Sequence, residues 1–435
     1  MISAEEKSYL RDLAKQVKEI SQNEIWKEKD RLWRKLNSLQ GERPMIICAV
    51  TDECWPEIIS GKDLKIEDPY LRAWEYDLKK KIYRWNNIHD DVIITDKIFV
   101  PIEYEFTDWV EGRRRPYAAN KPYESNGKTA EAFHPCILEY DDWDKLVCKP
   151  ELKYIDWKKT EDNMNLLDDI FGGNLQIIKG EPFYSSIDTT PTGWGTSAID
   201  ILCELRGLEE IMYDVIDAPE FVHMAMSYLV DCLSDYLDTL ESEGLLRINN
   251  DAFWKNTNTP LGSNGFAITD ELPGDDFDPS HIKTQDLWGY CQAQEFALVS
   301  PAMEDEFVIQ HQKKLAERFG LISYGCCESN DYKYDYLINA FPNLREISVS
   351  HAADIRIAAE KLKRDYVISW KPHATLINNF DREKVSKFMN DSFNVLKDNN
   401  VSCSLRDVLT IHGHPEYFGM WTDVAMEAAK QYERK

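Results

Sequence analysis

The sequence predicts an α/β protein, built as a (β/α)8 TIM-type barrel with an N-terminal helical extension and long loop insertions. Two observations predict this class. Short apolar runs recur along the chain after Pro44, and amphipathic stretches of helical length separate the later runs. Alternation of strand and helix is typical of parallel strands joined by crossover helices. Roughly eight such units in one chain favour a closed barrel over an open sheet.

The apolar runs have the length of buried strands. They are 45–50 (MIICAV), 92–94 (VII), 175–178 (LQII), 296–299 (FALV), 321–324 (LISY), 346–349 (EISV), 366–370 (YVISW) and 401–405 (VSCSL). Helices are predicted between the later runs, at 301–319, 332–340, 353–362 and 381–397. A further helix is expected to open at Asp217, a good N-cap residue that is followed by a proline in the first turn.

The segment 3–39 is also predicted to be helical. Ser3 and Glu6 have the spacing of a capping box, and apolar residues follow at helical intervals. Gly41 and Pro44 end this pattern. We therefore expect a helical extension over residues 1–41, followed by a single barrel domain over residues 42–435.

Two segments are expected to be insertions in the barrel. Residues 103–165 are rich in charge and aromatics and include Arg113–Arg115, while residues 249–285 carry many Gly, Pro, Asn and Asp. Both contain Trp and Phe, which need burial, so neither is expected to be a free linker. Insertions of this kind usually line the catalytic mouth of a barrel.

The charge of the chain excludes some classes of partner. The sequence has 51 Lys and Arg against 77 Asp and Glu, which gives a formal net charge of −26. A nucleic-acid binder needs clustered positive charge, and so does a protein that binds an anionic membrane surface. We expect neither partner for this chain.

Hydropathy and cysteine content predict a cytoplasmic protein. The sequence has no run of about 18 apolar residues, the length that spans a bilayer. The first residues are charged throughout and lack the apolar region of a signal peptide. Ten cysteines in a chain without an export signal are typical of free thiols or metal ligands rather than of a disulfide framework.

The densest chemical signal is the segment 321–330, LISYGCCESN. Tyr324, Cys326 and Glu328 are spaced two apart at the end of a predicted strand, so all three are expected to face one side, with Cys327 facing the other. A thiol and a carboxylate that point together into a barrel mouth suit zinc. The alternative is that the two cysteines are small buried hydrophobic residues.

Three more elements follow predicted strands. Cys403 lies near the end of the last apolar run, His351 follows the run 346–349, and Trp370-Lys371-Pro372-His373 ends the run 366–370. A barrel places its catalytic groups after successive strands. Each of these residues also has a structural alternative, either as a satisfied polar group or as part of the core.

The chain resembles the uroporphyrinogen-decarboxylase-like superfamily over residues 170–430. The segments 208–226 (LEEIMYDVIDAPEFVHMAM) and 295–320 (EFALVSPAMEDEFVIQHQKKLAERFG) are similar to its helix and strand-and-helix stretches. The segment 403–416 (CSLRDVLTIHGHPE) is similar to the tail of cobalamin-independent methionine synthase. The resemblance implies a (β/α)8 barrel, and the branch that it favours contains the zinc-dependent methyltransferases.

In that branch, zinc is bound by a His-x-Cys pair, a distant Cys and often an acidic group. The resemblance places Cys326 and Cys403 at the two cysteine positions. Tyr324 stands where the histidine is expected, and His351 stands near the place of the acidic ligand, so Glu328 or His351 is expected to complete the shell. Tyr324 and His373 are the catalytic candidates.

The function implied is methyl transfer between a small molecule and a corrinoid (cobalamin) carried by a separate protein, with Zn²⁺ as a Lewis acid. A methoxylated aromatic, a methylamine or a thiol would be the small molecule. Trp194, Trp288 and Trp370 are expected to form an aromatic wall for it. The alternatives are a metal-free decarboxylase and a non-catalytic barrel that binds a small ligand. The arginine-rich motif of the decarboxylase is absent from residues 43–56. The oligomeric state stays open, with a homodimer as one option.

Overall fold

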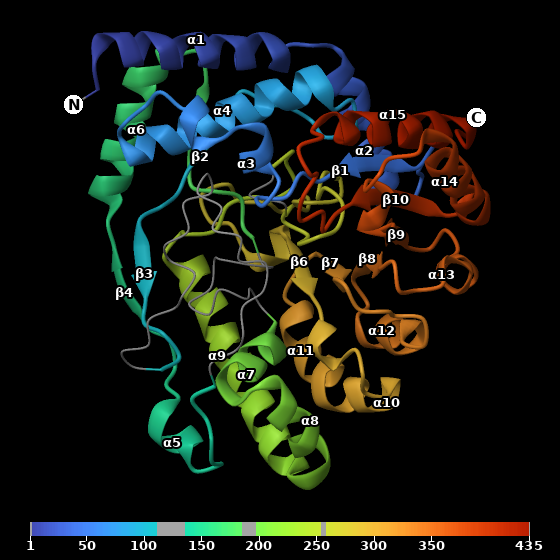
Figure 1. The fold of residues 1–435 in the computed structure, drawn as a ribbon. Helices are drawn as coiled ribbons and strands as arrows, with labels where there is room; N and C mark the ends of the chain where they lie inside the picture. Colours follow the sequence, from blue (N-terminus) through green and yellow to red (C-terminus); the bar gives the residue numbers. More distant parts are fainter. Residues whose placement is uncertain (1, 111–134, 185–196, 254–257, 435) are drawn as a thin grey trace.

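A six-stranded parallel sheet forms the centre of the α/β fold (Figure 1). The computed structural model describes residues 2–110, 135–184, 197–253 and 258–434. The strand order is β1-β10-β9-β8-β7-β6, so the last strand of the chain lies beside the first. All five neighbouring pairs are parallel.

Ten strands are defined in the described part of the chain. They are β1 Met45–Cys48, β2 Lys97–Val100, β3 Tyr104–Phe106, β4 Leu152–Ile155, β5 Gln176–Lys179, β6 Trp288–Cys291, β7 Leu321–Tyr324, β8 Leu344–Val349, β9 Val367–Trp370 and β10 Asn400–Leu405. The α-helices of the same part are α1 Ala4–Ser21, α2 Ile25–Asn37, α3 Trp55–Ile58, α4 Pro69–Asn87, α5 Asp142–Leu146, α6 Trp157–Phe171, α7 Ala198–Arg206, α8 Leu208–Asp217, α9 Pro219–Ser242, α10 Pro301–Glu304, α11 Gln310–Ala316, α12 Tyr334–Ala340, α13 Ile355–Leu362, α14 Arg382–Leu396 and α15 Glu416–Gln431.

The remaining strands form two pairs. Strands β2 and β5 pair in parallel, and β3 and β4 form an antiparallel pair within the expected insertion 103–165. The pair β2-β5 and the six-stranded sheet together supply eight parallel strands. Among the described residues, no ladder joins β1 to β2 or β5 to β6. The parallel α/β architecture is therefore confirmed, while closure of the barrel stays a prediction.

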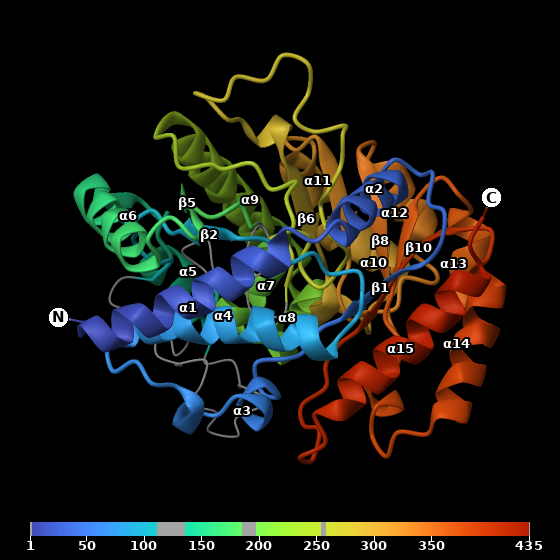
Figure 2. The ribbon, with the colours of Figure 1, turned by 90° about the horizontal axis from the view of Figure 1, so that it is seen from above.

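The N-terminal helices pack onto the body of the protein. The predicted capping box of α1 is present, because the Ser3 hydroxyl accepts the Glu6 amide and the Glu6 carboxylate accepts the Ser3 amide. Helix α1 lies along α4 (Figure 2), and Leu10 shares a buried cluster with Leu71 and Ile98. Helix α2 buries Trp33 against residues of β1.

Most predicted strands are present, and the predictions for two runs are wrong. Strand β7 has the predicted bounds, and β8, β9 and β10 overlap the runs predicted for them. The run 296–299 is not a strand. It follows a 3-10 turn, and Leu298 is 95% exposed. The strand of this region is β6, Trp288–Cys291. All four of its residues are buried, but the sequence WGYC is not a continuous apolar run. The run 92–94 likewise precedes β2 and does not form it.

Within the residues that the structure describes, no helix has both the length and the apolar character needed to cross a bilayer.

Candidate active site

The six-stranded sheet has two faces of different character. Successive side chains of a strand point to opposite faces, and residues in register on neighbouring strands share a face. We call one face the polar face; it carries Ser323, Glu346, Ser369 and Ser402. We call the other the helix face; it carries Cys291, Tyr324, Trp370 and Cys403.

Glu346 is a hydrogen-bond acceptor at the centre of the polar face. This carboxylate is fully buried, and burial raises its pKa to about 7. Its oxygens accept the Ser323 hydroxyl at 2.8 Å and the Gly265 amide at 3.2 Å. The second contact places part of the segment 249–285 against this face.

Gly325 redirects the chain at the end of β7. Its φ of +91° lies in the left-handed region, which glycine adopts without steric cost. A straight strand would place Cys326 on the same face as Tyr324. The turn at Gly325 instead brings the Cys326 sulfur within 3.4 Å of the Ser263 hydroxyl, which donates to it.

Lys371 organises this end of the sheet. Its ammonium group, directly after β9, donates to the Ser263 and Ser348 hydroxyls and to the Cys326 carbonyl. Lys371 is 4% exposed, so these contacts replace water around its charge. The result is a buried cation beside the Cys326 thiol at the carboxyl ends of β7, β8 and β9.

The Cys326 thiol is set up to ionise. The sulfurs of Cys326 and Cys327 lie 3.5 Å apart and share a hydrogen bond. This hydrogen bond, with the Lys371 charge and the Ser263 hydroxyl, lowers the pKa of Cys326 to about 6. The thiolate in turn raises the pKa of Cys327. The prediction that Cys327 faces away from Cys326 is therefore wrong, because the turn at Gly325 ends the strand alternation.

Glu328 closes the same turn through its carboxylate. Its oxygens accept the Cys326 amide at 2.8 Å and the Ala293 amide at 3.3 Å. The side chain is buried. Cys326 and Glu328 thus lie together, as the sequence predicts, although the carboxylate binds the backbone of Cys326.

Tyr324 lies on the helix face. Its hydroxyl donates to the Glu304 carboxylate at 3.2 Å, and its ring packs on Phe341. Burial raises the pKa of this phenol well above its ordinary value. The expectation that Tyr324 and Cys326 share one side is not met, again because Gly325 breaks the alternation.

Cys403 and Trp370 also lie on the helix face. The two residues are in register on β10 and β9, and Trp370 packs on Phe388 and Phe393 of α14. Cys403 is fully buried, and burial raises its pKa well above the ordinary value. The structure places neither side chain in an aromatic or metal-binding mouth.

The other predicted residues have three different placements. His351 and His373 are exposed and contact each other edge to face at 4.6 Å between ring centroids. His373 Nδ1 accepts the Thr375 amide and caps a short 3-10 turn. Trp288 is fully buried among apolar residues of the polar-face side, next to Leu261 and Ala267. Trp194 and the arginines 113–115 lie outside the described residues.

The expected zinc ligands do not form one site. Cys403 lies on the helix face, whereas Cys326 lies beyond the end of β7 with its sulfur against Ser263. Burial also raises the pKa of Cys403, whereas zinc binds a thiolate. Throughout the described ranges, no three His, Cys, Asp or Glu side chains are grouped so that they could hold a metal ion. The donor set present therefore does not fit the predicted ion.

No pattern in the sequence singles out Arg406, which follows β10. This guanidinium is 4% exposed; Nε donates to Ser404 and Nη1 donates to Asn258, but Nη2 has no partner among the described residues. Burial lowers the pKa of Arg406, and Asp407 and the thiols of Cys326 and Cys327 oppose this effect. Arg406 therefore brings an unpaired donor into the electrostatic range of the thiol pair.

A pair of carboxyl groups, Asp200 and Glu295, lies near the end of β6. Asp200 accepts the Gln292 amide and is fully buried, and Gln292 accepts the Tyr290 hydroxyl. Burial and the neighbouring Glu295 raise the pKa of Asp200 well above its ordinary value. Asp200 Oδ1 and Glu295 Oε2 have no donor among the described residues. A proton shared between the two carboxyl groups would supply that donor.

Comparisons with known proteins find similarity among solved structures only. No family model matches the chain, and no curated protein matches it. Among solved structures, a methyltransferase from Methanosarcina mazei is similar over 93% of this chain and 98% of its own, with a TM-score of 0.44 and 10% sequence identity. A likeness of this degree assigns neither a family nor an activity to the chain.

Proposed function

We propose that this chain is an enzyme that moves a methyl group between a small molecule and a corrinoid carried by a separate protein. We also propose that its eight parallel strands form a closed (β/α)8 barrel, with the reaction at their carboxyl ends. The superfamily resemblance of segments 208–226, 295–320 and 403–416 supports methyl transfer. A methoxylated aromatic, a methylamine or a methylated thiol is the proposed small molecule.

The observation that carries the proposal is the activated thiol of Cys326. A thiolate is a soft, polarisable nucleophile, and a pKa near 6 keeps it ionised at neutral pH. Lys371 and Ser263 hold it at the strand ends, where barrels place their chemistry. Sulfur of this kind attacks an sp³ methyl carbon readily.

The proposed step balances as a substitution. The Cys326 sulfur forms a bond to the methyl carbon while the bond from that carbon to the donor heteroatom breaks, and the electron pair leaves with the heteroatom. Arg406 has an unpaired Nη2 near the thiols, and in this scheme it stabilises the negative charge that develops on the leaving heteroatom. Cys326 regains its thiolate when the methyl group passes to the acceptor.

This scheme makes no use of zinc, because the described donors do not fit the ion. The thiolate scheme and the zinc scheme therefore predict different effects for substitution of Cys403. If zinc were bound as the resemblance implies, Cys326 and Cys403 would be equally essential. In the thiolate scheme only Cys326 is essential, since Cys403 lies on the helix face.

The test mixes the enzyme with a reduced corrinoid protein and a panel of methoxylated aromatics, methylamines and methylated thiols. Methylation changes the visible spectrum of the corrinoid. We expect Cys326→Ser to lower the rate by roughly a thousandfold or more, as for other lost nucleophiles, while the matched variant Cys403→Ser stays within about threefold of wild type. Enzyme incubated with the donor alone should gain the mass of one CH₂ unit on the Cys326 peptide.

Three results would overturn this scheme. Full activity of Cys326→Ser would remove the nucleophile. Equal losses in both variants, together with one zinc per chain by elemental analysis, would restore the metal site. No transfer and no mass gain with any member of the panel would leave the metal-free decarboxylase or the binding barrel as the better hypothesis.

A further inference from the structure

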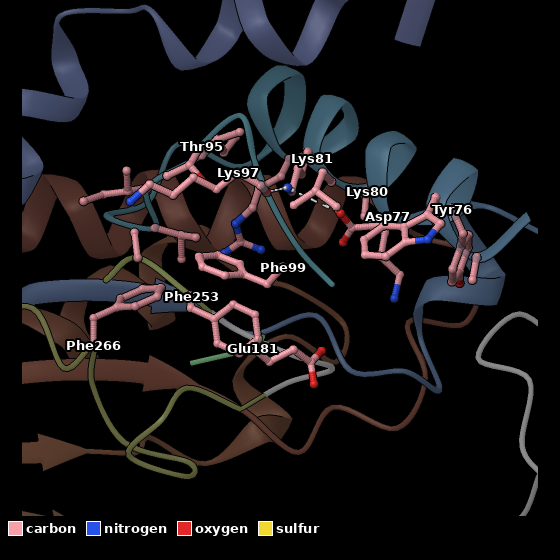
Figure 3. Close-up of a pocket in the computed structure, with 18 of the residues that line it drawn as sticks. Tyr76, Asp77, Lys80, Lys81, Thr95, Lys97, Phe99, Glu181, Phe253 and Phe266 are labelled. Atoms are coloured by element: carbon pink, nitrogen blue, oxygen red, sulfur yellow. Dashed lines mark hydrogen bonds and ion pairs between the residues drawn. The ribbon is translucent and has the colours of Figure 1, made fainter. Parts of the chain in front are cut away.

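A separate cavity of about 260 Å³ lies between α4, β2 and the residues 92–95 that lead into β2 (Figure 3). Residues 252–253 and Phe266 of the insertion 249–285 complete its wall. Most of the lining belongs to the chain from α3 to β2, whereas Cys326 and Lys371 follow β7 and β9. None of the residues placed in the reaction above lines this cavity.

One end of the cavity is aromatic. Phe99 of β2 and Phe253 pack edge to face, with 5.1 Å between ring centroids. Phe266 is fixed by Trp33 of α2 at 5.3 Å. Figure 3 shows these phenylalanines gathered on one side of the cavity. Aromatic rings in this arrangement can make edge-to-face or stacked contacts with a further aromatic ring.

The other end holds Lys80 of α4. Its ammonium lies 4.4 Å from the ring centre of Tyr76 and 5.3 Å from that of Trp55. The nearest carboxylate oxygen, on Asp52, is 3.4 Å away, and the Lys80 side chain is 17% exposed. Burial lowers the pKa of Lys80, and Asp52 offsets this only in part. The charge of Lys80 is therefore incompletely compensated.

The balance of charge in the lining favours an anion. Four cationic residues line the cavity (Lys80, Lys81, Arg84 and Lys97) against two acidic ones (Asp77 and Glu181). Arg84 and Lys97 are each held by a close carboxylate, Asp90 and Asp251. Lys81 lies 3.4 Å from Asp77 and also donates to the Lys97 carbonyl, whereas the ammonium of Lys80 has Asp52 at 3.4 Å and two aromatic rings. Lys80 is therefore the cation best able to accept a second partner.

We propose that this cavity binds a small aromatic carboxylate, with its ring against Phe99 and Phe253 and its carboxylate on Lys80. The volume is slightly below the usual range for drug-sized ligands, about 300 to 1,000 Å³, and so suits a single ring. The desolvation cost of a carboxylate is smaller here than in an apolar pocket, because the carboxylate would pair with a cation that is already buried. The site is independent of the methyl-transfer proposal.

The experiment is calorimetric titration with three probes of similar shape: benzoate, benzyl alcohol and benzylamine. We expect wild type to bind benzoate with a dissociation constant of about 1 mM or tighter, and benzyl alcohol more weakly. Lys80→Met keeps the length of the side chain and removes its charge. It should weaken benzoate by about tenfold or more and leave benzyl alcohol unchanged.

Two further variants make the result specific. Phe253→Ala should weaken benzoate and benzyl alcohol together, because it removes part of the ring contact. Lys314→Met, which removes an exposed lysine paired with Asp231, should change neither. Thermal melting of each variant checks that it folds.

The proposal fails if wild type shows no saturable binding of benzoate, or if Lys80→Met binds it as well as wild type. Tighter binding of benzylamine than of benzoate would reverse the assignment and point to Glu181. Because the assay measures binding without turnover, these results leave the methyl-transfer proposal untouched.

Discussion

Cys326 and Cys403 are chemically identical side chains at the carboxyl ends of strands in one sheet, yet they titrate in opposite directions. Cys326 accepts hydrogen bonds and sits beside the Lys371 charge, and its pKa is lowered to about 6. Cys403 is surrounded by apolar side chains of the helix face, and burial raises its pKa well above the ordinary value. Cys326 is partly buried and Cys403 is fully buried, and only Cys326 has hydrogen-bond donors and a cation that oppose the effect of burial.

The difference shows whether burial or local donors and cations decide the pKa of each thiol. Burial always disfavours the thiolate, and only donors or cations placed at the sulfur can overcome it. Cys326 has two such donors and a nearby cation, whereas Cys403 has only burial acting on it. The same contrast appears for carboxyl groups, since burial raises the pKa of Asp200 well above its ordinary value and no cation offsets that effect.

The largest expected effect is on alkylation by iodoacetamide. In native protein, Cys326 should react as its thiolate, with a rate that is half-maximal near about pH 6. Cys403 should react only after the fold opens, which makes it slower by at least about a thousandfold. Peptide mapping by mass spectrometry measures both rates, and similar rates for the two cysteines would break the comparison.

Lys371→Met is the variant that sharpens this result. The loss of the cation should move the Cys326 profile to higher pH and leave Cys403 unchanged, because Lys371 contacts only the Cys326 side. A profile that stays in place would show that the hydrogen bonds from Cys327 and Ser263 lower the pKa without the cation.

A smaller effect is expected from Gly325→Ala. A methyl group at this position would lie 2.8 Å from Asn330 Nδ2 and 3.1 Å from Ser348 Cβ, on a backbone with φ of +91°. We expect a loss of about 2 to 3 kcal/mol in the free energy of unfolding, measured with urea. Alkylation of Cys326 should slow as well, because the turn positions its sulfur.

Gly413→Ala is the matched control. Gly413 has a φ of +75°, but no atom lies within 4 Å of the added methyl group. The cost should therefore be the backbone term alone, about 1 to 2 kcal/mol, with Cys326 reactivity unchanged. Equal costs at the two glycines would show that the tight packing around Gly325 contributes nothing.

The smallest effect concerns Asp200→Asn, which mimics the protonated acid. Because the pKa of Asp200 is raised on folding, the folded chain binds more protons than the unfolded chain above about pH 4, and stability falls as pH rises toward the folded pKa. The variant lacks this loss. It should match wild type near pH 4 and exceed its stability at pH 8 on the order of 1 kcal/mol.

Urea titrations at several pH values measure this difference. The groups that act on Asp200 are the Glu295 carboxyl and the donors of Gln292 and Ser197, and the Cys203 thiol lies nearby. A variant that is less stable than wild type at pH 8 would show that Asp200 is ionised in the folded protein, and the reading of a shared proton would be wrong.

Local sequence determined much of the framework. The run Leu321–Tyr324 forms a strand with the predicted bounds, and Ser3 with Glu6 caps α1 as predicted, because both depend on neighbouring residues only. The prediction of a strand at 296–299 is wrong because strand position here depends on contacts far along the chain. The apolar residues of this run looked like a strand, but the register places β6 at Trp288–Cys291, where burial comes from the contacts of the whole sheet.

The candidate site was only half visible in the sequence. Cys326 and Glu328 stood out because they end a predicted strand, and the structure keeps them together. That Cys403 faces the helices depends on its register with Ile46 and Trp370, and that Cys326 leaves the row of Tyr324 depends on one backbone angle at Gly325. Ser263 and Lys371 are 108 positions apart in the chain. Their meeting at the Cys326 thiol was decided by tertiary structure, because hydrogen bonds and charge act through space and a pattern of residue types records only neighbours along the chain.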